Sequence, residues 1–324
     1  MSLPVKRLSN VSFRDEHPAA GDVRSEILAG LEAQPKSINP KYFYDTVGSQ
    51  LFEQITQAPE YYPTRTEKKL LDEYQDEIAE YCGSDCIFIE PGSGNCEKVR
   101  LLLSSFKPAV YVPIDIAADF LKSAAMQLGR ECPWLKIQAV CADFNQSWSF
   151  VDGLPAGKKV VFYPGSTIGN LEPDAALRFL KRICSVVGSG GGALIGVDLH
   201  KSSERLNAAY NDAEGVTADF NFNALTRVNE VLDAEFDRAE FEHKAFYNTE
   251  LQRIEMHLVS RRGQSIRCNG GSISMSPGES IHTENSYKYS IAGFSELAVS
   301  AGLQVQRSWV DEDNLFSVHY LNVR

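Results

Sequence analysis

The segment from residue 87 to residue 115 limits what the whole chain can fold into. It combines an apolar strand pattern, a glycine loop, a helical pattern and a second apolar strand pattern, which cover residues 87–89, 91–95, 97–103 and 111–114. Each strand pattern ends at an acid, Glu90 and Asp115. A strand, a glycine turn, a helix and a strand that ends in a carboxylate make up a nucleotide-binding βαβ unit. The segment therefore predicts an α/β fold with a ligand site at the glycine loop.

The glycine loop also indicates which ligand it suits. Gly92 and Gly94 let the backbone turn tightly and come close to a ligand, because glycine has no Cβ. A dinucleotide fingerprint has a third glycine three residues after the second, where this chain has Glu97. An acid near a helix N-terminus disfavours a pyrophosphate. With Glu90 and Asp115, the loop suits a ligand with a cationic head and a free ribose diol, which favours S-adenosylmethionine (SAM) over NAD. An ordinary tight turn is the alternative.

Length and charge narrow the class of protein. The chain has 324 residues, enough for a large core and two domains. Its net charge of −11 repels a phosphate backbone, so we expect no nucleic-acid partner. No apolar run reaches the roughly 20 residues that span a bilayer, and the N-terminal residues lack a signal-peptide core. We therefore expect no membrane association and a cytoplasmic location.

Cysteine and histidine usage argues against a metal site and against disulfides. The seven cysteines are odd in number and show no C-x-x-C spacing, and the six histidines form neither H-E-x-x-H nor H-x-x-x-H. We expect reduced, mostly buried thiols and no bound metal.

The rest of the chain continues the alternation of strands and helices as far as residue 200. Strand patterns at 136–141, 159–163 and 193–197 are followed by Asp143-Phe144, by the polar loop 164–170 and by Asp198. This spacing predicts a parallel, doubly wound sheet with the loop 164–170 beside the ligand. Residues 1–20 look irregular, and helices are expected at 21–33 and 66–81. After residue 200 come long helical patterns and then β patterns up to 283, which predict an inserted domain. A hairpin at 304–323 would complete the sheet edge.

An aromatic stretch precedes the first helix of the nucleotide fold. Between residues 42 and 62 it carries Tyr42, Phe43, Tyr44, Tyr61 and Tyr62, with Phe52 as a sixth ring. Tyrosine combines an apolar ring with a polar hydroxyl that seeks a partner when buried. The stretch fits either a substrate pocket wall or an aromatic core patch.

Several of these stretches together resemble the SAM-dependent histidine Nα-methyltransferase family of ergothioneine biosynthesis. The matching segments are PKYFYDTVGSQLFEQITQAPEYYPTRTE, GSGNCEKVRLLL, YVPIDI, ADF, GSTIGNLEP, AYNDAEGVTADFN, RIEMHL and TENSYKYS. The resemblance implies a class I SAM-methyltransferase Rossmann-like sheet with an inserted α+β substrate-binding domain. Residues 66–200 plus 286–324 would form the methyltransferase domain, and 8–65 plus 201–285 the histidine-binding domain.

The resemblance also implies roles for individual residues. Positions that contact the cofactor fall on Gly92, Lys98, Asp115, Asp143 and Phe144, and the loop adds Glu90, Ser93 and Gly94. Positions that contact histidine fall on Tyr61, Asn170, Tyr210, Glu284 and Ser286, with Tyr44 and Met256 also lining that pocket. Tyr44, Tyr61 and Asn170 would lie at the reacting amine as catalytic residues. Pro91 and the pair Asn95-Cys96 depart from the family pattern in the loop, but neither removes a side chain that the chemistry needs.

The activity implied is the transfer of three methyl groups from SAM to the α-amino nitrogen of L-histidine. The products would be hercynine, the first intermediate of ergothioneine biosynthesis, and S-adenosylhomocysteine (SAH). We expect a monomer. Two alternatives are open: an enzyme of the same fold that methylates another amino acid such as tryptophan, and a non-catalytic SAM-binding scaffold. The acids at 90, 115 and 143 and the intact aromatic stretch argue against the scaffold.

Overall fold

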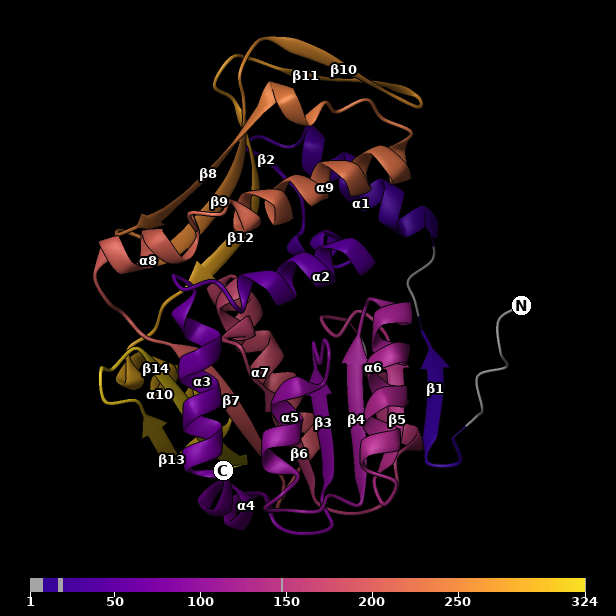
Figure 1. Cartoon of the computed structure of the whole chain (residues 1–324), viewed down its shortest axis with the longest axis vertical. Helices are drawn as coiled ribbons and strands as arrows, with labels where there is room; N and C mark the ends of the chain where they lie inside the picture. The colour runs from indigo at the N-terminus through magenta and orange to yellow at the C-terminus, as the bar shows by residue number, and fades with distance from the viewer. Residues whose placement is uncertain (1–7, 17–19, 147, 324) are drawn as a thin grey trace.

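The computed structural model describes residues 8–16, 20–146 and 148–323. Its largest element is an eight-stranded sheet in the order β1-β5-β4-β3-β6-β7-β14-β13 (Figure 1). The strands are β1 (Val11–Asp15), β3 (Ile87–Pro91), β4 (Val110–Asp115), β5 (Lys136–Cys141), β6 (Lys159–Tyr163), β7 (Gly192–Asp198), β13 (Leu303–Val310) and β14 (Phe316–Val323). The first six in the sheet order run parallel, and β14 is antiparallel to both β7 and β13. The predicted parallel sheet and its C-terminal hairpin are confirmed.

Helices cover both faces of this sheet. One face carries α3 (Tyr62–Glu73), α4 (Gln75–Cys82), α5 (Glu97–Leu102) and α6 (Ala118–Glu131), and the other carries η2 (Ser149–Gly153), α7 (Pro173–Val187) and α10 (Ile291–Ser300). The central strands β3, β4, β6 and β7 are buried on both sides, as parallel strands under two helix layers must be. In β3, Phe88 packs into one core, while Ile87 and Ile89 pack into the other. We call the sheet and these helices the lower unit.

Two local predictions from the sequence are wrong. Residues 11–15, expected to be irregular, form β1, which pairs with β5 at the sheet edge. The parts of that expectation on residues 1–7 and 17–19 lie outside the described residues. The single helix expected over 66–81 is two helices, α3 and α4, which meet at Tyr74. α3 begins at Tyr62 with Pro63 in its first turn, where the missing N–H of proline costs no helical hydrogen bond.

A second group of elements packs above the carboxyl ends of the parallel strands (Figure 1). Its sheet, in the order β2-β12-β9-β8, consists of β2 (Lys36–Ser37), β12 (Ser280–Tyr287), β9 (Arg253–Ser260) and β8 (Phe241–Asn248), and β10 (Gln264–Cys268) pairs with β11 (Gly271–Met275). Its helices are α1 (Ala20–Glu32), η1 (Pro40–Phe43), α2 (Thr46–Ile55), α8 (Ser203–Ala209), α9 (Val216–Leu232) and η4 (Arg238–Glu240). We call these elements, which share one apolar core, the upper unit.

The predicted division of the chain stays a prediction. β1 belongs to the sheet of the lower unit, although residues 8–65 were assigned to the histidine-binding domain. Polar contacts join the two units: Glu172, just before α7, accepts hydrogen bonds from Arg253 Nη1 at 2.9 Å, Asn285 Nδ2 at 2.8 Å and the Tyr287 hydroxyl at 2.6 Å. In the described part of the chain, no helix has the length and apolar character needed to cross a membrane.

Candidate active site

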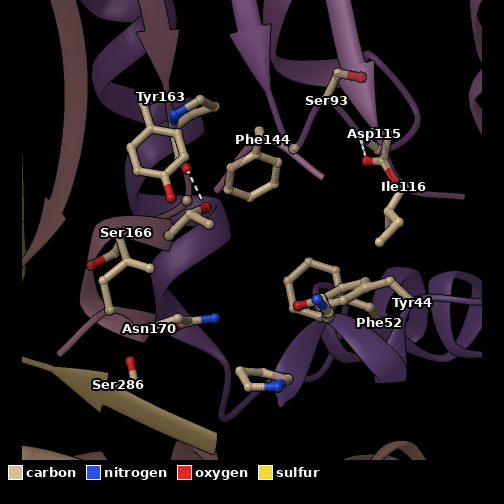
Figure 2. Close-up of a pocket in the computed structure, with 18 of the residues that line it drawn as sticks. Tyr44, Phe52, Ser93, Asp115, Ile116, Phe144, Tyr163, Ser166, Asn170 and Ser286 are labelled. Carbon is tan, nitrogen blue, oxygen red and sulfur yellow. Dashed lines mark hydrogen bonds between the residues drawn. The ribbon is translucent and has the colours of Figure 1, made fainter. Parts of the chain in front are cut away.

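A cavity of about 510 Å³ lies between the two units, at the carboxyl ends of the parallel strands. In an open α/β sheet ligands bind at this edge, where the strand order reverses, which here is between β3 and β6. Figure 2 shows side chains from the loops after these strands facing rings and hydroxyls of the upper unit. The cavity is lined by all the predicted site residues except Met256: Tyr44, Tyr61, Glu90, Gly92, Ser93, Gly94, Lys98, Asp115, Asp143, Phe144, Asn170, Tyr210, Glu284 and Ser286.

The glycine loop is held in place by the acid at the end of β4. Asp115 Oδ2 accepts a hydrogen bond from the Gly94 amide at 2.9 Å, and Oδ1 accepts one from the Ala117 amide at 3.0 Å. Gly92 and Gly94 have φ angles of +69° and +52°, in the left-handed region that favours glycine. Burial raises the pKa of the Asp115 carboxyl. Asp115 therefore fixes the loop through hydrogen bonds from backbone amides, and its carboxylate also lines the cavity.

Two further ionisable side chains, Glu90 and Lys98, line the cavity near the loop. Glu90, at the end of β3, is 2% exposed, accepts a hydrogen bond from the Tyr111 hydroxyl, and has its pKa raised to about 8 by burial. Lys98 of α5 lies 2.6 Å from Glu67 Oε2, whose carboxylate also accepts hydrogen bonds from the Gly165 amide. Glu67, absent from the sequence prediction, thus ties the Lys98 side chain to the loop after β6.

An aromatic pocket follows β5. The Phe144 ring lies edge to face with Tyr163 and Phe179, with centroids 6.0 and 6.2 Å apart. Asp143 Oδ2 lies 3.1 Å from Lys41 Nζ of the upper unit. This combination of flat apolar rings beside a carboxylate suits a purine ring that carries an amino group.

Aromatic rings of the upper unit form the opposite wall. The Tyr44 ring contacts Phe52 edge to face at 5.8 Å between centroids, and Tyr61 contacts Phe52 at 6.3 Å and Tyr210 at 6.1 Å. Burial raises the pKa values of Tyr44 and Tyr61 well above their ordinary range. These hydroxyls therefore stay protonated at neutral pH. Part of the aromatic stretch thus forms a wall of the cavity, while Phe43 packs in the core of the upper unit. The two predictions for this stretch, a pocket wall and an aromatic core patch, each hold for some of its residues.

Asn170 is brought into the cavity by a close contact between the units. It ends η3 (Thr167–Asn170), and its amide points into the open space above Ser286 (Figure 2). A Cβ on Gly169 would lie 2.7 Å from the Tyr287 carbonyl oxygen, so only glycine allows η3 to pack this closely on β12. Ser166 before it adopts a left-handed φ of +54°, and its Oγ accepts a hydrogen bond from the Asp198 amide at 2.9 Å.

Glu284 of β12 provides the carboxylate on the upper side of the cavity. Burial raises its pKa to about 7, against the opposing effect of the Lys288 charge. Its Oε2 is buried and has no hydrogen-bond partner among the described residues, and the same holds for Ser93 Oγ and the Tyr163 hydroxyl. Buried polar atoms are nearly always paired in proteins. Three such atoms lining one cavity indicate that a polar ligand completes them.

Met256 does not line the cavity. It pairs directly with Glu284 across β9 and β12, so the two side chains share a face of the sheet, but Met256 is 1% exposed and lies in the core of the upper unit. It therefore packs in the core beside Glu284, and the prediction that it lines the substrate pocket is wrong for this structure.

The sequence prediction missed a buried charged network below Ser286. Lys288 Nζ and Lys201 Nζ lie 2.7 and 2.6 Å from opposite oxygens of Asp198, and the Tyr62 hydroxyl donates to the same carboxylate at 2.8 Å. One signal was available: side chains of a strand alternate, so Lys288 is expected on the face that carries Glu284 and Ser286.

One histidine cluster lies on the outer face of the upper sheet, away from the lining of the cavity. His257 Nε2 lies 3.0 Å from Glu255 Oε2, and the rings of His257 and His282 are stacked at 4.7 Å with an interplanar angle of 14°. A metal ion binds in the plane of each imidazole ligand, and two stacked rings have no common in-plane position. The cluster as arranged therefore does not fit a metal ion, and the expectation of a metal-free protein stays a prediction.

The residues around the glycine loop fit a SAM molecule. A buried acid below a left-handed glycine turn, a carboxylate at the end of the next strand and an aromatic pocket after the third provide partners for an amino acid head, a ribose diol and an adenine. The unpartnered Ser93 Oγ and Tyr163 hydroxyl are polar groups that such a ligand would pair.

Comparison with known proteins agrees with this geometry. The profile of the family described as "Histidine-specific methyltransferase, SAM-dependent" matches residues 23–323. The histidine N-alpha-methyltransferase of Mycolicibacterium smegmatis is 41% identical over 310 residues, which are 94% of this chain and 96% of that protein. Its counterpart in Mycobacterium tuberculosis is 39% identical and covers 91% of this chain and 93% of that protein. Ergothioneine biosynthesis protein 1 of Neurospora crassa is 29% identical over 98% of this chain and 37% of that protein. The chain therefore belongs to the family of SAM-dependent, histidine-specific methyltransferases.

Proposed function

We propose that this enzyme transfers three methyl groups from SAM to the α-amino nitrogen of L-histidine, giving hercynine, as the first step of ergothioneine biosynthesis. The match to the histidine-specific family over residues 23–323 supports the reaction class and the amino acid. The names of the mycobacterial and Neurospora relatives support the α-nitrogen and the pathway. Neither another amino acid substrate nor a non-catalytic scaffold is favoured by these relatives.

The lower end of the cavity would hold the cofactor. Glu90 and the amides of Gly92 to Gly94 would bind the amino acid head of SAM, Asp115 the ribose diol, and Asp143 with Phe144 the adenine. Lys98, fixed by Glu67 at 2.6 Å, would face the carboxylate of the same head. SAM supplies a methyl group on a sulfonium ion, an electrophile that an amine lone pair displaces in line.

The upper end would hold histidine. Asn170 would donate a hydrogen bond to the substrate carboxylate, and Tyr210, whose hydroxyl donates to Ser286 at 2.8 Å, would line the site beside it. Glu284 would accept one from a ring N–H, and Ser286 would contact the second ring nitrogen. A site built to pair a polar ring rejects an apolar analogue because its own buried groups are then left unpaired. The unpartnered Glu284 Oε2, facing the same cavity as the glycine loop, is the observation that carries this assignment.

The residues around the amine would act by position rather than by taking up a proton. Holding two reactants in near-attack geometry supplies about 7 to 11 kcal/mol of a barrier. The substrate must react as the neutral amine, and burial beside a sulfonium charge lowers the pKa of its α-ammonium group. Burial raises the pKa values of Tyr44 and Tyr61. A tyrosine with a raised pKa is a poor general base, so we assign both hydroxyls to orienting the amine.

The test is to incubate the protein with SAM and each of the twenty amino acids and to analyse the products by mass spectrometry. Histidine should give products heavier by 14, 28 and 42 mass units, with fragments that place every methyl on the α-nitrogen. A different amino acid that reacts while histidine does not would refute the substrate assignment. Binding of SAM without any product would favour the scaffold.

A further inference from the structure

Lys288 directs all three of its hydrogen-bond donors to side chains at the cavity. It follows β12 and its side chain is fully buried. Its Nζ lies 2.7 Å from Asp198 Oδ2, 2.7 Å from Ser286 Oγ and 3.4 Å from the Tyr210 hydroxyl oxygen. An ammonium group has three donors and no acceptor, so these three partners account for it completely.

As a consequence, the Ser286 hydroxyl can only donate, and cannot accept, a hydrogen bond with a ligand in the cavity. Its Oγ accepts hydrogen bonds from Lys288 Nζ at 2.7 Å and from the Tyr210 hydroxyl at 2.8 Å. A hydroxyl oxygen has two lone pairs, so both are used and the remaining Ser286 proton is free for the cavity. If the order of the two hydroxyls is reversed, the free proton lies on Tyr210 instead. In either order the pair presents a donor.

We infer that Lys288 is a positioning residue that fixes the Ser286–Tyr210 pair as a hydrogen-bond donor, so that the cavity selects a substrate ring with an unprotonated acceptor nitrogen. This inference rests on the proposed function, in which the substrate ring is an imidazole. With Glu284 as acceptor on one side and Ser286 as donor on the other, the neutral ring satisfies both. An imidazolium ion would bring a second N–H against the Ser286 proton.

Lys288 could instead serve only to neutralise the Asp198 carboxylate, but the other partners of Asp198 argue against that role. Asp198 Oδ1 keeps Lys201 Nζ at 2.6 Å, and the Tyr62 hydroxyl lies within 2.9 Å of both oxygens. The carboxylate thus stays paired when Lys288 is removed. Lys201 contacts Asp198 and Tyr62, whereas Lys288 contacts Ser286 and Tyr210. Lys201→Met is therefore a matched control: it removes a cation from the same carboxylate and leaves the donor pair supported.

The titratable groups near the ring position come from several elements. Glu284 and Lys288 belong to β12 and the residues after it, Tyr44 and Tyr61 flank α2, Tyr210 follows α8, and Asp198 ends β7. Burial keeps the three tyrosines protonated by raising their pKa values.

The test measures binding in the presence of SAH by calorimetry, for histidine and for the pyrrolylalanine isomers, which keep one ring N–H and lack the acceptor nitrogen. Losing a hydrogen bond to a charge-supported donor costs roughly ten- to a hundredfold in affinity. The wild-type protein and Lys201→Met should both prefer histidine by that factor, and Lys288→Met should reduce the preference to about threefold or less. A folded Lys288→Met protein with the full preference would overturn the inference.

A second measurement does not depend on how well the variant folds. In wild-type protein with SAH and ¹⁵N-labelled histidine at pH 5.5, where a ring with a pKa of about 6.5 is mostly protonated in solution, the bound ring should show one protonated and one unprotonated nitrogen. Two protonated ring nitrogens would overturn the inference. Absence of any histidine binding would instead refute the proposed function, so the two failures are distinct.

Discussion

Lys41 Nζ lies 3.1 Å from Asp143 Oδ2, so the segment before α2 is joined by an ion pair to the carboxylate at the end of β5. The same nitrogen lies 2.7 Å from Glu26 Oε2 of α1. The proposed adenine acceptor therefore also anchors the upper unit, and cofactor binding and the seating of the upper unit share one residue.

Asp143→Asn is expected to weaken SAH binding by roughly tenfold. The amide removes a charged acceptor for an adenine amino group, and hydrogen bonds to charged groups contribute more than neutral ones. Calorimetric titration with SAH measures this change. Asp152→Asn, an exposed acid in η2, serves as the control and should bind as the wild type does. Unchanged SAH affinity in Asp143→Asn would remove this residue from the cofactor site.

Glu284→Gln is expected to change how activity depends on pH. Burial raises the pKa of Glu284 to about 7, so the carboxyl is protonated below that pH and becomes a full acceptor above it. The ratio of wild-type to Gln-variant kcat/KM for histidine should therefore rise between pH 6 and pH 8 and then level off. Taking the ratio cancels the titration of histidine itself.

Glu250→Gln is a suitable comparison for that experiment, because Glu250 is exposed in the turn between β8 and β9. The ratio of wild-type to Glu250→Gln kcat/KM for histidine should not change with pH. A flat ratio for Glu284→Gln as well would contradict a role for the ionised carboxylate in ring binding.

Gly169→Ala is expected to lower histidine turnover while SAH binding is retained. The new methyl group would meet the Tyr287 carbonyl oxygen at 2.7 Å and push η3 away from β12, which moves Asn170 relative to Ser286. Overpacking of this kind costs about 1 to 3 kcal/mol, so the melting temperature should fall too. Gly271→Ala, with open space around its Cβ position, controls for the added methyl. Normal turnover in Gly169→Ala would show that this contact does not position Asn170.

Tyr44→Phe is expected to lower kcat by about tenfold at most, because it removes one orienting hydrogen bond worth roughly 0.5 to 1.5 kcal/mol. Burial holds the pKa of Tyr44 well above its ordinary range, so the alkaline part of the pH–rate profile should stay as in the wild type. Tyr42→Phe, whose hydroxyl bonds to Glu26 at 3.0 Å, is the control. A thousandfold loss together with an altered pH profile would identify Tyr44 as a base.

The glycine loop and the strand ends could be predicted because their signals are local. A left-handed turn favours glycine, and an acid directly after an apolar strand lies at the carboxyl edge of the sheet. β1 could not be found in this way, because four of its five residues are exposed and the strand forms only by pairing with β5. Strand propensity predicts such edge strands poorly, because pairing with a neighbouring strand determines whether they form.

The substrate side of the cavity shows where sequence patterns stop being sufficient. Met256 and Glu284 face the same way, yet only Glu284 lines the cavity. A register shift between His282 and Glu284 places Glu284 on the sheet face of Met256 instead of the face of His282. A bulge of this kind has no clear sequence signal, whereas Lys288 could have been found from strand alternation. Asp198 was recognised only as a strand end, because its partners Tyr62 and Lys288 come from distant segments of the chain, and Lys201, only three residues away, has no motif that marks it.

The pairing of β2 with β12 means that the upper sheet is complete only after a late segment of the chain has been synthesised. Lys36 pairs with Ile281, so β2 can pair only after β12, which lies much later in the chain, has been synthesised. A nascent chain that already carries the whole glycine loop still lacks Glu284 and Ser286. A truncated translation product would thus keep the glycine loop proposed to bind SAM but lack the residues proposed to bind histidine.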